Sequence, residues 1–123
     1  MKQIQQLHRD AMTAAESGTV AKRNNDSEAA LRYFREALDL ETQAAGCAPA
    51  GYEPTRSVLY RSAASLALEC GNEREAERLA AQGLAGDPPE EIADELREIL
   101  LNTSAAASIR KRLKSKAKLA GKR

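Results

Sequence analysis

The chain has 123 residues, of which 42% are hydrophobic and 30% are charged, a balance expected of one folded domain rather than a disordered segment. Aromatic residues make up 3% and Trp is absent, so the core is expected to consist mainly of its 24 Ala and 14 Leu, a helix-forming composition. No stretch approaches the roughly 20 apolar residues of a membrane-spanning helix, and the first ten residues lack the apolar run of a signal peptide. We therefore expect a cytoplasmic protein.

The first predicted hairpin covers residues 4–45. Its first helix, over about 4–23, has apolar and small residues spaced by three or four, which places them on one helical face. Asn25 is predicted to cap a second helix that extends to Ala45, with Glu28 completing a capping box. The faces expected to be buried contain Leu7, Ala11, Ala14, Gly18 and Ala21 in the first helix and Ala30, Phe34, Ala37 and Leu38 in the second.

Residues 46–54 are predicted to form a loop, because two Gly and two Pro fall within nine residues. A second hairpin follows over 55–86. Thr55 is expected to cap its first helix, which ends near Gly71, and Asn72 to cap the next one, with Glu75 at the matching offset. The faces expected to be buried contain Leu59, Tyr60, Ala63, Leu66 and Ala67, and then Ala76, Leu79, Ala80, Gly83 and Leu84.

A fifth helix is predicted over residues 88–102. Gly86 should end the helix before it, Asp87 should cap it, and Pro88 suits the first helical position because the N–H that it lacks has no partner there. Its apolar stripe is Ile92, Leu96, Ile99 and Leu100. No segment alternates as a strand does, so we predict an all-α fold.

An internal repeat links the two hairpins. Matching small and apolar residues recur at a constant offset of 46 residues, which indicates repeated helical hairpins. The matching residues are Ala30, Phe34, Ala37 and Leu38 in the second helix and Ala76, Ala80, Gly83 and Leu84 in the fourth.

Residues 57–89 resemble a tetratricopeptide repeat, a helix–turn–helix unit of about 34 residues. Tyr60 fits the aromatic position early in the first helix, Gly71 the turn, and Pro88 the terminating proline. An earlier unit, over 11–40, is matched by Gly18, Ala30, Phe34 and Ala37. Because the offset is 46 rather than 34, about twelve residues are expected to be inserted around 46–58.

The resemblance implies a short right-handed α-solenoid, made of two antiparallel helical hairpins and a C-terminal capping helix within residues 1–102. Members of this family are adaptors that bind a peptide or helix in a groove lined by the first helix of each unit. The chaperone-binding subset is not expected, because Ala15 and Thr19 stand where Lys and Asn would grip a carboxylate. The groove residues implied here, whose cations would pair with acids of a partner, are Met12, Thr19, Lys22, Arg23, Arg56, Val58, Arg61, Ser65 and Leu68.

Two further interpretations concern other parts of the chain. Tyr52, in the insertion, is a second candidate contact, because exposed loops often carry recognition. The first 45 residues also resemble a small three-helix domain that binds trafficking proteins in eukaryotes, although that resemblance leaves the later helices unexplained. A simple spacer is the alternative to an adaptor.

Residues suited to catalysis or metal binding are sparse. His8 is the single histidine and has no suitable partner near it in sequence, so we expect a solvated or packed residue. Cys47 and Cys70 lack CxxC spacing and are expected to be reduced thiols. The isolated glycines form no phosphate-binding motif. These patterns predict a protein that is not an enzyme and needs no cofactor or metal.

The C-terminal tail, residues 103–123, is strongly basic. Residues 104–123 carry eight Lys or Arg and no acid, whereas residues 1–103 carry 11 basic and 18 acidic side chains, a net charge of −7. The tail is interpreted as a solubilising end, as an arm for nucleic acid or an acidic protein, or, least favoured, as a segment on an anionic membrane. Its candidate binding residues are Arg110, Lys111, Arg112, Lys114, Lys116 and Lys118.

The function predicted from the sequence is therefore a cytoplasmic, non-catalytic adaptor or assembly factor that binds another protein. The alternative is a nucleic-acid-associated protein that binds through its tail. Self-association is a further expectation, because a short array of repeats leaves the outer face of its first helix uncovered.

Overall fold

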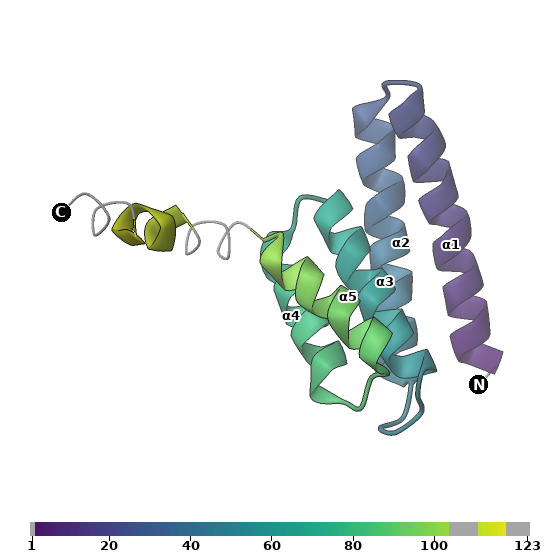
Figure 1. Cartoon of the computed structure of the whole chain (residues 1–123). Helices are drawn as coiled ribbons and strands as arrows, with labels where there is room; N and C mark the ends of the chain where they lie inside the picture. Colours follow the sequence, from purple (N-terminus) through teal and green to yellow (C-terminus); the bar gives the residue numbers. More distant parts are fainter. Residues whose placement is uncertain (1, 104–110, 118–123) are drawn as a thin grey trace.

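The computed structural model describes residues 2–103 and 111–117, and the described chain is all-α (Figure 1). Its five principal helices are α1 (Lys2–Arg23), α2 (Ser27–Cys47), α3 (Thr55–Glu69), α4 (Glu73–Ala85) and α5 (Glu90–Leu101). Residues 111–117 form a further short helix with exposed side chains. The described residues contain no strand, so the prediction of an all-α fold is confirmed.

The helices α1 and α2 form a long hairpin, whose turn extends past the other helices in Figure 1. Asn25 adopts a left-handed conformation at φ 60°, and the N–H of Asp26 donates to the carbonyl of Ala21 at 2.9 Å. The Asp26 carboxylate then caps α2 by accepting from the N–H of Ala29. The prediction that Asn25 caps α2 was wrong by one residue, because Asn25 is the residue that reverses the chain.

The turn between α3 and α4 has the same construction. Gly71 is left-handed at φ 73°, the N–H of Asn72 donates to the carbonyl of Ala67 at 2.9 Å, and the Asn72 side chain accepts from the N–H of Glu75. The prediction that Asn72 caps this helix is confirmed. All these positions follow their counterparts in the first turn by 46 residues, so the sequence repeat corresponds to a repeat of local geometry.

Much of the inserted length lies in α2 rather than in the loop. This helix has 21 residues, whereas α4 has 13. Gly46 and Cys47 continue α2, so the prediction that the loop begins at residue 46 was wrong, and the connection covers residues 48–54. Gly46 inside the helix costs roughly 1 kcal/mol of stability relative to alanine. The burial of Ala44 and Ala45 in the core offsets this cost.

Two helix starts differ from the sequence prediction. Thr55 is the first residue of α3 and not its cap; the Glu53 carboxylate accepts from the N–H of Ser57 at 2.9 Å. Helix α5 begins at Glu90, after Pro88 and Pro89, so Asp87 does not cap it. Instead, the N–H of Asp87 donates to Glu53 at 3.2 Å. Glu53 therefore accepts hydrogen bonds from backbone N–H groups at the start of α3 and before α5. The sequence had predicted Thr55 and Asp87 as the caps at these two places.

The core is built from small residues and a few large ones. One cluster joins the C-terminal half of α2 to α3, α4 and α5, with Leu79 and Leu96 almost fully buried. A second cluster lies around Phe34 between α1 and α2 and includes Leu66 of α3. Burying each leucine contributes roughly 1.5–3 kcal/mol. Within residues 2–103 and 111–117, no helix is both long and apolar enough to cross a bilayer.

Candidate peptide-binding groove

Helices α1 and α3, the first helices of the two hairpins, both pack against α2 and approach each other only locally. Near their N-termini they line one pocket together. Near their C-termini, Lys22 Nζ of α1 lies 3.2 Å from Glu69 Oε2 of α3. The two helices therefore approach each other at both ends, where this pocket and this ion pair lie. Arg61 of α3 reaches α5, where its Nη1 lies 2.6 Å from Glu95 Oε2.

The α1–α3 pocket is a hollow of about 240 Å³ between the N-terminal ends of these two helices. It is smaller than the roughly 300 Å³ at which small-molecule sites begin. Aliphatic groups from both helices form most of its wall, and an amide and a hydroxyl lie among them. A pocket of this size and lining suits one apolar side chain. The lining residues are Ile4, Gln5, His8, Pro54, Thr55, Val58 and Leu59.

A histidine–glutamate pair borders the pocket. The Glu41 side chain is fully buried, and both of its carboxylate oxygens lie 2.9 Å from Nδ1 of His8, whose side chain is 42% exposed. An ionised carboxylate only accepts hydrogen bonds, so Nδ1 carries the proton when Glu41 is charged. A buried carboxylate needs such a partner, because desolvating an unpaired charge is costly. The pair holds His8 at the pocket wall.

The sequence did not identify this pair. His8 and Glu41 are 33 residues apart and meet only when α1 packs against α2. A signal was nevertheless present, since Glu41 follows Ala37 by four residues on the buried stripe of α2. A charged residue on such a stripe indicates a buried partner.

The predicted groove residues on α1 divide between packed and exposed positions. Met12 is half-buried and packs against the cluster around Phe34. Thr19 and Arg23 are exposed, and the Thr19 hydroxyl donates to the carbonyl of Ala15. Lys22 is in the ion pair with Glu69. None of the four lines the α1–α3 pocket itself.

Among the predicted residues on α3, Val58 lines the pocket and Ser65 is exposed. Leu68 packs against the cluster that includes Leu96 of α5. Arg56 turns toward α4, where its Nη2 donates to the carbonyl of Gln82 at 3.2 Å and its guanidinium lies 4.8 Å from the Tyr60 ring centre. Arg56 and Arg61 therefore already contact groups of their own chain.

The remaining predicted contacts do not line the α1–α3 pocket. Tyr52 is 40% exposed in the connection after α2. Lys111, Arg112, Lys114 and Lys116 are exposed on the 111–117 helix, whereas Arg110 and Lys118 lie outside the described residues.

Cys47 is exposed and Cys70 is partly buried, and both are free. Burial raises the pKa of the Cys70 thiol, an effect that the positive charge of Arg35 opposes and the negative charge of Glu69 reinforces. In the described part of the chain, no three His, Cys, Asp or Glu side chains are grouped to hold a metal ion.

Comparisons with protein-family models, with curated proteins and with solved structures each found no significant match to this chain.

Proposed function

We propose that this protein is a tetratricopeptide-like adaptor, a short solenoid of two repeats and a capping helix, which binds a peptide or helix of another protein between α1 and α3. The supporting observation is the apolar α1–α3 pocket, formed by the first helices of two hairpins that share one turn geometry. Neither helix could form this pocket alone.

Binding would depend on one apolar side chain of the partner that enters the pocket and on polar groups at the edge of the pocket. An aliphatic or aromatic side chain of the partner enters between Val58 and Ile4, and its burial contributes roughly 1.5–3 kcal/mol. Gln5 and Thr55 supply polar groups at the same pocket for the backbone of the partner. One small anchor is typical of a weak, exchangeable interaction rather than a permanent complex.

The proposal is tested with peptides selected on the intact chain from a displayed random library. The selected sequences should share one apolar residue. Replacing Val58 by Asp puts a charge into the pocket and should weaken binding by at least about tenfold, measured by calorimetry. The matched control is Val20→Asp, since Val20 is an exposed valine of α1 outside this pocket.

Circular dichroism must show that both variants remain folded. Equal affinity of a selected peptide for the wild type and Val58→Asp would refute a role of the pocket. Equal loss in both variants would also refute it, because the effect would then not depend on the pocket.

A further inference from the structure

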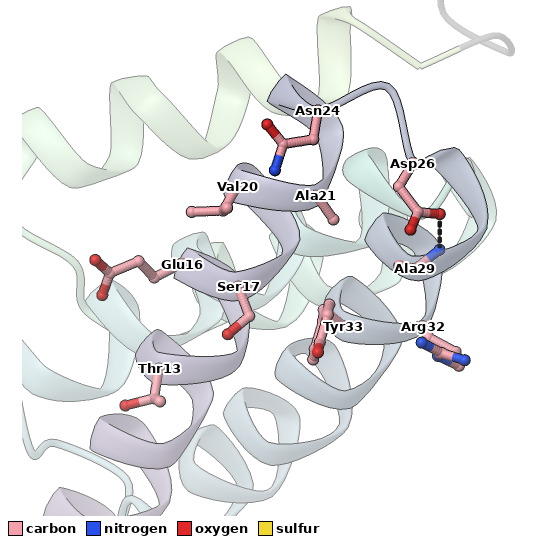
Figure 2. A pocket seen from close by; sticks show the side chains of 10 residues that line it. All are labelled: Thr13, Glu16, Ser17, Val20, Ala21, Asn24, Asp26, Ala29, Arg32 and Tyr33. Carbon is pink, nitrogen blue, oxygen red and sulfur yellow. Dashed lines mark hydrogen bonds between the residues drawn. The ribbon is translucent and has the colours of Figure 1, made fainter.

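A second groove runs along the other flank of α1, where this helix packs against α2. Figure 2 shows its upper part, with Ser17 and Tyr33 lying toward each other between the two helices and the other helices behind them. This hollow has a volume of about 610 Å³, and a neighbouring hollow of about 430 Å³ shares some of its lining and extends to Leu40. We call this surface the outer groove; its central residues are Thr13, Ser17, Val20, Ala29, Tyr33 and Leu40.

The outer groove combines apolar side chains with an acidic lining. Val20 is 45% exposed, although it is a large aliphatic residue. Asp10, Glu16, Asp26 and Glu36 also line the two hollows, whereas Arg32 is the single cation among the lining residues. None of these four acids forms an ion pair with another described residue. The surface therefore suits an apolar helix face bordered by positive charges.

The chain itself contains such a helix. In the 111–117 helix, Leu113 and Ala117 are four residues apart and share one face, and Leu113 is 61% exposed. Lys111, Arg112, Lys114 and Lys116 surround this face, and the segment has no acid. The charge of this helix is opposite to that of the outer groove. Leu113 of the helix and Val20 of the groove are both exposed aliphatic side chains.

We propose that the 111–117 helix of one molecule docks in the outer groove of a second copy of this chain. Leu113 packs against Val20 and Tyr33, while the surrounding lysines approach Asp10, Glu16 and Glu36. The contact uses the flank of α1 opposite to the α1–α3 pocket, so it leaves the proposed peptide site open and does not depend on it.

Chain length favours a second copy over the same molecule. The seven residues 104–110 separate the described end of the domain from the tail helix, so residues 103 and 111 are eight steps apart and can lie at most about 29 Å from each other. The domain ends after α5, which packs against α3, whereas the outer groove lies between α1 and α2, and α2 packs against α3 (Figure 1). The packed pairs α5–α3, α3–α2 and α2–α1 are each separated by about 8–10 Å, and these distances, together with the path around the domain, use up that reach.

The contact joins two different surfaces, so it produces a reciprocal dimer, a ring or a longer array. Because it depends on exposed charges, it should weaken as the salt concentration rises.

The test is analytical ultracentrifugation of the full-length protein over a range of concentrations at low salt, after nuclease treatment. We expect the mass to increase with concentration. Leu113→Asp and Val20→Asp should each weaken association by about tenfold, whereas Val58→Asp and Arg74→Glu, at an exposed arginine of α4, should leave it unchanged.

A charge exchange tests the pairing of the two surfaces. A tail variant, Lys114→Glu with Lys116→Glu, should not self-associate, and neither should a groove variant, Asp10→Lys with Glu36→Lys. Mixing the two should restore a complex, because the reversed tail then meets a reversed groove. A monomer at every concentration, association that nuclease abolishes, or mixed variants that stay apart would each overturn the proposal. Preferential binding of the tail to anionic vesicles, with no self-association, would also overturn it.

Discussion

A side chain at Gly18 would collide with Phe34: a Cβ built at this glycine would lie 2.9 Å from Cε1 of the Phe34 ring. The second hairpin has the reverse arrangement, in which a Cβ at Gly83 of α4 would lie 3.0 Å from Cβ of Tyr60 on α3. At the offset of 46, the Gly18–Phe34 pair corresponds to Ala64 and Ala80. In each hairpin an aromatic residue therefore packs against a glycine of the other helix, through the ring of Phe34 in the first hairpin and through Cβ of Tyr60, beside the Leu96 side chain, in the second.

The first prediction concerns the close contact between Gly18 and the Phe34 ring. Gly18→Ala should destabilise the protein by about 1–2 kcal/mol, because the cost of displacing a buried ring exceeds the gain of about 1 kcal/mol in helix propensity. In a Phe34→Ala background the same change should be neutral or stabilising, since the ring is gone and the pair matches Ala64 and Ala80. Urea denaturation of the double-mutant cycle measures this coupling. Additive effects would show that the ring does not limit position 18.

The second prediction concerns the two left-handed turn residues. Gly71→Ala should destabilise the protein by about 1–2 kcal/mol, because a side chain disfavours φ 73°. Asn25→Gly should be neutral or stabilising, since glycine adopts φ 60° without strain. Thermal unfolding of both variants checks this. No loss of stability in Gly71→Ala would show that the residue does not hold this turn conformation in solution.

The third prediction concerns the His8–Glu41 pair. His8→Ala should destabilise the protein by about 1–3 kcal/mol, a range reduced from that of fully buried pairs because His8 is partly exposed. Replacing both residues, with Leu at position 41, should recover most of the loss, because no buried carboxylate remains unpaired. Chemical denaturation compares the variants. If the double variant were less stable than His8→Ala, the carboxylate would have a role beyond this pair.

The fourth prediction concerns thiol reactivity. Burial disfavours the Cys70 thiolate and raises its pKa, so at a given pH less of this thiol is in the reactive form. Cys47 is exposed, so alkylation at neutral pH should modify Cys47 first. Arg35→Ala should slow Cys70 further, because the arginine charge opposes the upward shift. Mass spectrometry of timed samples measures both rates; faster alkylation of Cys70 would contradict this description of its surroundings.

The same shift has a consequence for stability. A raised pKa in the folded state means that folding favours the protonated thiol. This contribution is present at pH values below the pKa of the unfolded thiol and is lost as the pH rises through the folded pKa. Cys70→Ala should therefore make stability less dependent on pH in the alkaline range. An unchanged pH dependence would contradict this assignment.

The parts of the fold that local chemistry determines were predictable from the sequence. Asn72 follows a glycine and precedes an apolar stripe, and only one residue there suits the cap. At the first turn, Asn25 and Asp26 both suit a cap, and the choice depends on which of them adopts the left-handed conformation. The start of α3 was missed because its cap comes from Glu53, upstream of the expected position.

The candidate site was less predictable, because it depends on how the helices pack. Val58 was identified through the family resemblance, whereas Ile4 and His8 join it only when α1 lies beside α3. Arg56 and Arg61 were expected to face a partner, but Arg56 donates a hydrogen bond to α4 and Arg61 donates one to α5. Sequence spacing places a residue on a helix face, but it does not show which neighbouring helix that face meets.

The most direct test of the proposed function is to locate a selected peptide on the intact chain by NMR chemical-shift mapping. We predict that the largest changes fall on Ile4, His8 and Val58, around the α1–α3 pocket, and that residues of α4 change little. Changes concentrated on the 111–117 helix or on the face of α4, with the pocket residues unaffected, would contradict it.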